Sequence, residues 1–152
     1  MDNKLAGFPV NKILVAVDGS ENSNKAVALG VEIARKWKPK VYIINVTEDN
    51  IPEGFARFAH DEHVSVSEYY KRACSQIVAD AAGAFIRSGI KKIVTTCPSG
   101  DPAEEIIKAA EDNDVDLILM GIMGRGGFSR KVMGSVSSKV CNHVKSTCIT
   151  VK

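Results

Sequence analysis

The chain has 152 residues, enough for one ordinary domain with a real hydrophobic core. Hydrophobic residues make up 45% of it and charged residues 25%, which is typical of a globular protein and excludes a largely disordered chain. Its 20 Lys and Arg against 18 Asp and Glu give a net charge of only +2, whereas proteins that hold nucleic acid by its phosphates usually carry a larger basic excess. No segment approaches the roughly 20 apolar residues of a membrane span.

The four cysteines are Cys74, Cys97, Cys141 and Cys148, and no two of them form a C-x-x-C pair. A chain of this size does not need disulfides to fold. The segment from Met1 to Lys12 lacks an apolar stretch long enough for a signal peptide. We therefore expect free thiols and a cytoplasmic location.

Five short apolar runs rich in Val and Ile predict strands. In chain order they are Ile13–Val17, Val41–Val46, Ile93–Cys97, Leu117–Met120 and Cys148–Val151. The first run is continuous and not alternating, which is typical of strands buried on both faces of a parallel sheet that helices cover.

The segments between these runs have helical periodicity. Two stripes at helical spacing are Ala26, Gly30, Ile33 and Trp37 after Ser20, and Val66, Tyr70, Ala73, Ile77, Ala81 and Ala84. The predicted buried faces of the later helices are Ile106, Ile107 and Ala110, and Val136, Val140 and Val144. Asp101, Pro102 and Glu104 predict a helix start, with a capping side chain, a proline at the first helical position and an acid in the first turn. The last helix is expected to begin near Gly134.

Alternating strands and helices predict one domain: an open, doubly wound parallel sheet of five strands with helices on both faces. Both the flavodoxin-like and the split-order Rossmann-like strand orders remain open. Ligands in such sheets bind beyond the carboxyl ends of the strands. The segments at those ends are Asp18–Ser20, Thr47–Asp49, Pro98–Asp101 and Gly121–Ser135, with a long variable loop at 47–65.

A glycine-rich segment, Gly121 to Ser137, follows the fourth predicted strand and leads into the last helix. Glycines let the backbone approach a ligand, and the free N–H groups of a helix N-terminus attract phosphate. From Gly121 to Lys152 there are six basic residues and no acid. Neither a P-loop nor the dinucleotide fingerprint is present. On these residues alone, a glycine-rich turn with a serine cap remains an alternative.

The spacing Gly121-x2-Gly124-x9-Gly134-Ser135 resembles the ATP-binding signature of the universal stress protein family. Further segments resemble the same family across effectively the whole chain: Lys12–Ser20, Ile44–Val46, Gly100–Pro102 and Asp116–Gly121. The resemblance implies a Rossmann-like fold of the adenine nucleotide alpha hydrolase type. It also implies ATP as the ligand, with Mg²⁺ or Mn²⁺ bridging the phosphate oxygens and not held by the protein alone.

The resemblance implies that Asp18 accepts hydrogen bonds from the ribose hydroxyls and that the backbone of Val46 meets adenine. Gly124, Gly134 and the two serines after it would hold the phosphates. The complete set of expected nucleotide-contacting residues is Ala16, Val17, Asp18, Val46, Met120, Gly121, Gly124, Arg125, Gly126, Gly134, Ser135, Val136 and Ser137. No catalytic residue is expected. Asp18 is interpreted as a ribose ligand and not as a general base.

The predicted function is that of an ATP-binding regulator or sensor in a stress response, acting as a homodimer that pairs through Cys148, Ile149, Thr150 and Val151. An exposed apolar edge strand invites such pairing. The alternatives are a slow ATPase or an adenylyl- or phosphoryl-transfer enzyme on the same fold, and a binder of AMP or a cyclic dinucleotide. A metal site at His60 and His63 is a weaker hypothesis, because no third ligand stands at a suitable spacing.

Overall fold

The computed structural model describes residues 7, 8, 10–48, 65–124 and 133–152. Its elements are β1 (Lys12–Ala16), α1 (Glu21–Trp37), β2 (Lys40–Ile44), α3 (Val66–Arg87), β3 (Ile93–Thr96), α4 (Pro102–Asp112), β4 (Leu117–Gly121), α5 (Ser135–His143) and β5 (Thr147–Val151). The ends of all five strands lie within two residues of the predicted ones. No helix in the described ranges is long and apolar enough to cross a membrane.

The five strands form one parallel sheet in the order β3-β2-β1-β4-β5. This is the split Rossmann-like order, so the flavodoxin-like alternative is wrong. The order reverses between β1 and β4. In such sheets a crevice opens at this point, beyond the carboxyl ends of the two strands.

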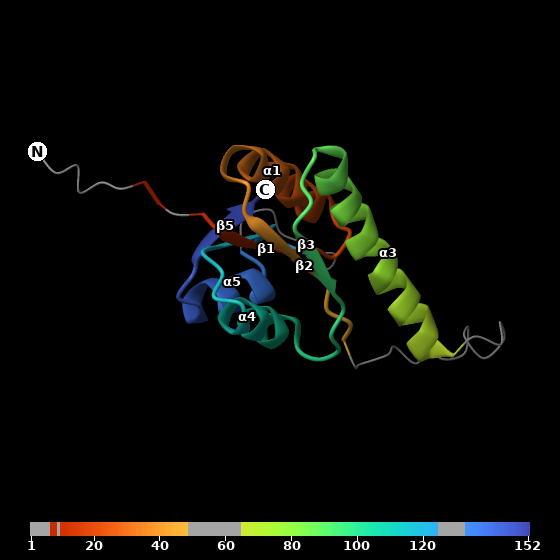
Figure 1. Ribbon diagram of the computed structural model, residues 1–152. Helices are drawn as coiled ribbons and strands as arrows, with labels where there is room; N and C mark the ends of the chain where they lie inside the picture. Colours follow the sequence, from red (N-terminus) through yellow and green to blue (C-terminus); the bar gives the residue numbers. More distant parts are fainter. Residues whose placement is uncertain (1–6, 9, 49–64, 125–132) are drawn as a thin grey trace, which may run out of the picture.

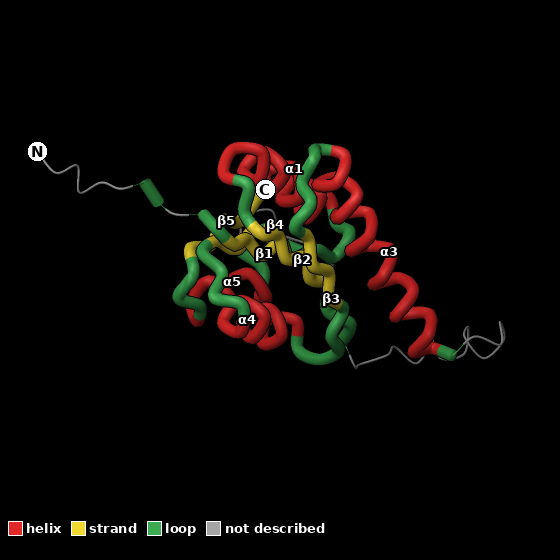
Figure 2. The backbone as a smooth tube through the Cα atoms, viewed as in Figure 1, coloured by secondary structure: helices red, strands yellow, loops and turns green. Residues whose placement is uncertain are grey.

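The core has two halves, one on each face of the sheet. Alternate side chains of β1 enter opposite halves: Ile13 and Val15 pack with residues of α1 and α3, whereas Leu14 and Ala16 pack with residues of α4 and α5. Figures 1 and 2 show α1 and α3 on one face and α4 and α5 on the other. This two-sided cover explains the continuous hydrophobic run of β1.

Side-chain caps fix the starts of three helices. The Ser20 hydroxyl accepts a hydrogen bond from Ser23 N at 3.2 Å, and Ser65 accepts one from Glu68 N at 3.0 Å. Asp101 accepts one from Glu104 N at 2.9 Å, and Pro102 is the first residue of α4. The predicted helix start at Asp101 is therefore confirmed. Each cap satisfies an N–H group that lacks a partner within the helix.

Two apolar segments are more exposed than their composition suggests. Trp37 is 46% exposed, because it is the last residue of α1 and lies beyond the buried face of that helix. In β3 the side chains from Val94 to Thr96 are exposed, because this strand lies at the edge of the sheet. Hydrophobic composition predicts a strand here but does not show that the side chains on both of its faces are exposed.

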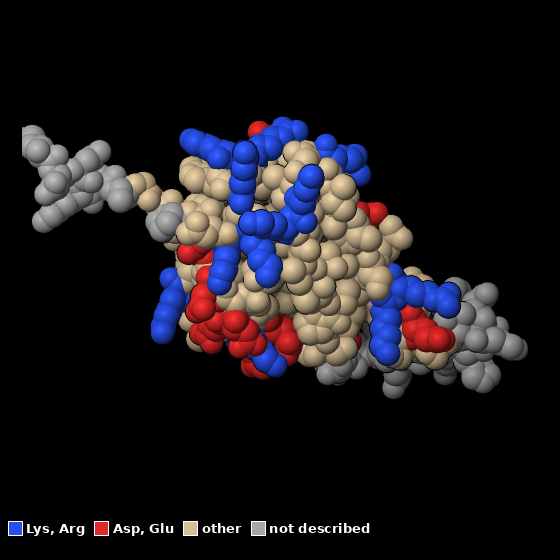
Figure 3. All heavy atoms as spheres, viewed as in Figure 1, with Lys and Arg blue, Asp and Glu red and all other residues tan. Residues whose placement is uncertain are grey.

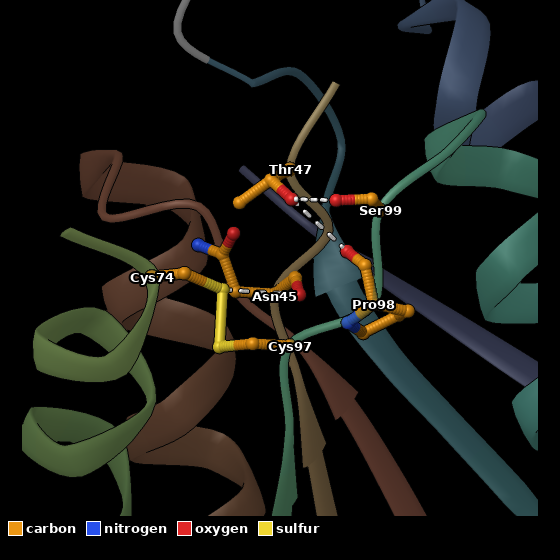
Figure 4. The surroundings of a disulfide bond; sticks show 6 residues. All are labelled: Asn45, Thr47, Cys74, Cys97, Pro98 and Ser99. Carbon is orange, nitrogen blue, oxygen red and sulfur yellow. Dashed lines mark hydrogen bonds between the residues drawn. A yellow bond between two sulfur atoms is a disulfide. The ribbon is translucent and has the colours of Figure 1, made fainter. Parts of the chain in front are cut away.

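The prediction of four free thiols is wrong. Cys74 of α3 and Cys97, which directly follows β3, form a disulfide, and their Cα atoms are 6.1 Å apart (Figure 4). The two residues are 23 positions apart in the chain, and only the packing of α3 beside β3 brings them together. Cys141 and Cys148 are free, and Cys148 packs against the core half that α4 and α5 cover, as expected for a small hydrophobic residue.

Candidate functional site

A pocket of about 770 Å³ opens beyond the carboxyl ends of β1, β2 and β4. One side of the pocket is formed by the end of β1, the start of α1 and Ile44–Glu48. The remaining walls come from α3 between Tyr70 and Ile77, from the start of α4, from Met120–Gly124 and from Met133–Ser137. This volume lies in the ordinary range for small-molecule and cofactor sites. The pocket occupies the position at which the strand order predicts a ligand.

Asp18 is held in a fixed orientation at the end of β1. Its backbone N–H donates to the Ser23 hydroxyl at 3.1 Å, and its Oδ1 accepts from Ser20 N at 2.9 Å. Its other carboxylate oxygen is directed at Gly124, where an added Cβ would lie 2.6 Å from Oδ2. Because Gly124 has no side chain, the space in front of the Asp18 carboxylate stays open.

Gly121 lets the start of α1 pack directly on the end of β4. A Cβ at this position would lie 2.9 Å from the Cβ of Asn22 and 3.0 Å from the backbone nitrogen of Ser23. Ser23 also accepts the hydrogen bond from Asp18 N. Gly121 thus supports the geometry of Asp18 through the backbone of α1. From the sequence, we expected Gly121 only to contact the ligand.

Gly134 is the N-cap residue of α5, and Ile122 holds it in place. Gly134 N donates to Ile122 O at 2.8 Å, and the buried Ser137 hydroxyl donates to the same carbonyl at 2.8 Å. A Cβ at Gly134 would lie 3.0 Å from that oxygen. These contacts join the start of α5 to the segment that leaves β4, and they assign the Ser137 hydroxyl to a hydrogen bond within the protein.

The first turn of α5 lines the pocket through Ser135, Val136 and Ser137. Within the described residues, no side chain makes a capping hydrogen bond at this helix start, unlike the starts of α1, α3 and α4. Ser135 is exposed there and lines the pocket. N–H groups without intrahelical partners, at the positive end of a helix dipole, attract anions.

The backbone of Val46 borders the pocket from the β2 side. Asn45 N donates to Thr96 O at 3.2 Å, and Thr47 N donates to Pro98 O at 2.9 Å, so the amides on both sides of Val46 point towards β3. Because backbone groups alternate along an extended chain, the Val46 amide and carbonyl point towards β1. Val46 and Ala16, near the end of β1, both line the pocket.

Sequence reasoning missed the wall that α3 provides. Tyr70, Ala73 and Ile77 belong to a stripe that was interpreted only as one face of a helix, but they line the pocket, and Ile77 also packs against the core. The buried residues of this helix are Cys74, Val78, Ala81, Ala82 and Phe85. A stripe at helical spacing shows which face of a helix is apolar, but it does not distinguish a core contact from a pocket wall. Met123 and Met133, between the signature glycines, line the pocket as well.

Charge is distributed unevenly around the pocket. The described lining residues include Asp18 and Glu48 but no Lys, Arg or His. Lys139 of α5 instead contacts Glu104 at 3.1 Å and Asp101 at 3.3 Å, and hydrogen bonds to these two carboxylates raise its pKa. The hydrogen bond from the backbone N–H of Glu104 lowers the pKa of Asp101, and the hydrogen bond with Lys139 lowers it further. Lys139 therefore contributes to the contact between α4 and α5 and not to the pocket.

Other basic side chains gather around the amino ends of the strands, and acidic side chains gather over α4 (Figure 3). Lys12 and Lys40 begin β1 and β2, and Lys92 precedes β3, at the opposite end of the sheet from the pocket. Arg125 and Gly126 of the expected site lie outside the described residues, as do His60 and His63. Among the described residues, no group of three His, Cys, Asp or Glu is arranged to hold a metal.

Residues 9–152 match the universal stress protein family model. The chain belongs to the universal stress protein family. It is 30% identical over 141 residues to a universal stress protein of Methanocaldococcus jannaschii, covering 93% of this chain and 81% of the relative. It is also 30% identical over 150 residues to universal stress protein YxiE of Bacillus subtilis, covering 91% of this chain and 95% of the relative.

Solved structures of universal stress proteins have the same fold. UspA from Lactobacillus plantarum superposes with a TM-score of 0.72 at 22% identity, over 96% of this chain and all of the other. A universal stress protein in complex with cAMP gives 0.69 at 19% identity, over 95% and 98%. The Archaeoglobus fulgidus protein in complex with dAMP gives 0.62 at 17% identity, over 96% and 100%. These structures confirm the Rossmann-like fold class.

Proposed function

We propose that this universal stress protein binds an adenine nucleotide, and specifically ATP, in the pocket beyond β1, β2 and β4. The observation that carries the proposal is the pairing of Asp18 with the uncapped start of α5 in one pocket of about 770 Å³. A fixed carboxylate suits ribose hydroxyls, and bare helix amides suit phosphates. Two family members solved in complex with cAMP and dAMP support an adenine nucleotide as the ligand class.

In the proposed binding mode the adenine lies between the ends of β1 and β2. It meets the backbone of Val46 and packs on Ala16 and Met120, all of which line the pocket. The ribose lies at Asp18, and the phosphates run past Gly124 to the amides of Ser135 and Val136. The Ser137 hydroxyl supports this arrangement through its bond to Ile122 O rather than by direct contact.

Hard divalent cations prefer oxygen ligands. The described pocket offers oxygen donors in the Asp18 carboxylate and the Ser20 and Ser135 hydroxyls. We propose that Mg²⁺ or Mn²⁺ is held chiefly by the ATP phosphates, with such oxygens or water completing its coordination. The cation would neutralise phosphate charge that no described lysine or arginine of the pocket meets.

We further propose that the protein is a regulator whose nucleotide occupancy reports stress or energy status in the cytoplasm. The rival function is that of an ATPase or of an adenylyl- or phosphoryl-transfer enzyme. Among the described lining residues, Asp18 and Glu48 are the carboxylates, and Asp18 already accepts a backbone hydrogen bond. Catalysis would require a base aligned with an attacking group.

Calorimetric titration with ATP, ADP, AMP and cAMP, with and without Mg²⁺, tests the binding proposal. We expect ATP with Mg²⁺ to bind most tightly, and tighter binding of AMP or cAMP would contradict the choice of ATP. Turnover on the same preparation separates the two functions. Hydrolysis near the enzyme median of roughly 10 s⁻¹ would favour the enzyme, and a far slower rate favours the regulator.

We also propose that the chain forms one domain that dimerises through β5. Thr147 N donates to Asp116 O and Val151 O accepts from Ile122 N, so alternate residues of β5 pair with β4. The backbone groups of Cys148 and Thr150 lie between these positions and therefore point away from β4. The strand is at the edge of the sheet, and its side chains from Cys148 to Val151 are only partly buried. An edge of this kind can pair with a second copy.

A further inference from the structure

The Cys74–Cys97 pair lies in the wall of the pocket. Cys74 is 2% exposed and lines the pocket, together with its helical neighbours Tyr70, Ala73 and Ile77. Its sulfur lies 3.3 Å from the carbonyl oxygen of Asn45, the residue before Val46 (Figure 4). The pair thus joins α3 to the segment that follows β3, and it lies beside the residue that precedes Val46, where we propose that adenine binds.

The position of Cys74 along α3 determines which part of this helix the disulfide holds. It is the first buried residue of the helix, and the residues from Val66 to Ala73 are exposed or only partly buried. Figure 1 shows this half of α3 extending past the edge of the sheet. The disulfide therefore fastens α3 at the point where its packing on the sheet begins. Without it, the pocket wall formed by Tyr70 and Ala73 lacks a covalent tie to the sheet.

The other half of the bond lies on a segment that is already held. After Cys97, Pro98 O accepts from Thr47 N at 2.9 Å, Gly100 N donates to Thr47 O at 3.0 Å, and the Thr47 and Ser99 hydroxyls are 2.8 Å apart (Figure 4). These bonds hold the connection from β3 to α4 against the end of β2 in either redox state. Reduction of the disulfide should therefore free the first half of α3, whereas the segment that carries Cys97 should stay in place.

The site suits both redox states. Cys97 is an exposed residue, and we expect a small disulfide or dithiol in solution to reach it. Cys74 is buried, but its thiol in the reduced form has an acceptor ready in Asn45 O at 3.3 Å. A buried polar group with a partner costs little free energy. The reduced protein is thus expected to stay folded.

We propose that Cys74 and Cys97 are a reversible redox site whose oxidation raises nucleotide affinity by fixing α3 in the pocket wall; this rests on the proposed nucleotide binding. The oxidant is a low-molecular-weight disulfide. The Cys97 thiolate attacks one of its sulfurs, forming a mixed disulfide and releasing one thiol. The Cys74 thiolate then attacks the Cys97 sulfur and releases the second thiol, and the two cysteine protons end on the two released thiols. A dithiol reverses both steps.

The test compares the full chain after equilibration with oxidised glutathione and after reduction with dithiothreitol. Peptide mass mapping should find Cys74 joined to Cys97 only in the first sample. Calorimetry should give an ATP affinity about tenfold higher for the oxidised form, as expected if reduction leaves the binding-competent wall populated roughly one tenth of the time. Hydrogen exchange without nucleotide should be slower in 66–77 of the oxidised form.

Cys97→Ser removes the exposed partner, and we expect this variant to bind ATP with the affinity of the reduced parent under both conditions. Cys141→Ser, which alters a cysteine outside the described pocket lining, should keep the parent's redox difference. Equal ATP affinity of both parent forms, or no Cys74–Cys97 linkage after oxidation, would overturn the proposal. If neither form binds nucleotide, the proposed function fails. The hydrogen-exchange rates in 66–77 then test separately whether the disulfide fixes α3, and equal rates in both forms overturn that claim.

Discussion

Gly134→Val tests the placement of the phosphates. The backbone at Gly134 has φ −63° and ψ 155°, which any residue can adopt, so the effect of a side chain there comes from space and not from backbone strain. The added Cβ would lie 3.0 Å from Ile122 O, where ordinary contacts begin at 3.4 Å. The same oxygen accepts hydrogen bonds from Gly134 N and the Ser137 hydroxyl, both at 2.8 Å.

The start of α5 must therefore move by a few tenths of an ångström, and the branched valine side chain also extends beyond its Cβ. If the amides at this helix start bind phosphate, the move misaligns at least one charge-assisted hydrogen bond, which is worth about 1.5–3 kcal/mol. The expected result is at least a roughly tenfold rise in the ATP dissociation constant. AMP, with a single phosphate, should lose less.

Calorimetric titration of ATP and AMP measures both effects, on samples whose fold is checked by thermal unfolding. Gly7→Val is the matched control, because a Cβ there meets nothing within 4 Å. Ser135→Ala should weaken ATP binding less, since it keeps the backbone amide. Parent-like ATP binding by folded Gly134→Val, or equal losses for ATP and AMP, would refute the reasoning.

Three further predictions follow from other parts of the structure. Asp18→Ala should weaken ATP, ADP and AMP by similar factors in calorimetry, since all three share the ribose; a loss confined to ATP would contradict the ribose assignment. Thr150→Pro removes an N–H that points away from β4, so light scattering should report a folded monomer; an intact dimer would exclude pairing through β5. Burial, followed by the interaction with Cys141, raises the pKa of the Cys148 thiol to about 12, so its alkylation at pH 8 should be much slower than that of an exposed cysteine thiol. Because the folded state holds this proton more tightly, the thiol should also lower stability as pH rises from 9 towards 12, and Cys148→Ala should reduce that loss in denaturant titrations.

Local chemistry made much of the fold predictable. The Val- and Ile-rich runs located all five strands to within two residues, and Asp101 with Pro102 located the start of α4. Spacing also placed Asp18 and the signature glycines at one edge of the sheet, where Asp18, Gly121, Gly124 and Gly134 line one pocket. These features depend on residues close together in the chain, so periodicity and capping rules apply to them.

Features that depend on packing between distant segments were not predictable. Nothing in the sequence shows that Cys74 meets Cys97, that Lys139 meets Asp101 and Glu104, or that the Ser137 hydroxyl bonds to Ile122 O. The apolar stripe of α3 is visible in the sequence, but only the tertiary arrangement shows that Tyr70 and Ile77 line a pocket. The choice between the two strand orders also needed the observed pairing of β1 with β4.

A crystal structure of the protein grown with ATP and Mg²⁺ tests the central claim most directly. We expect a ribose hydroxyl within hydrogen-bond distance of the Asp18 carboxylate, adenine against the Val46 backbone, and the phosphates at the amides of Ser135 and Val136. Nucleotide bound elsewhere, or with its phosphates directed away from the start of α5, would contradict it.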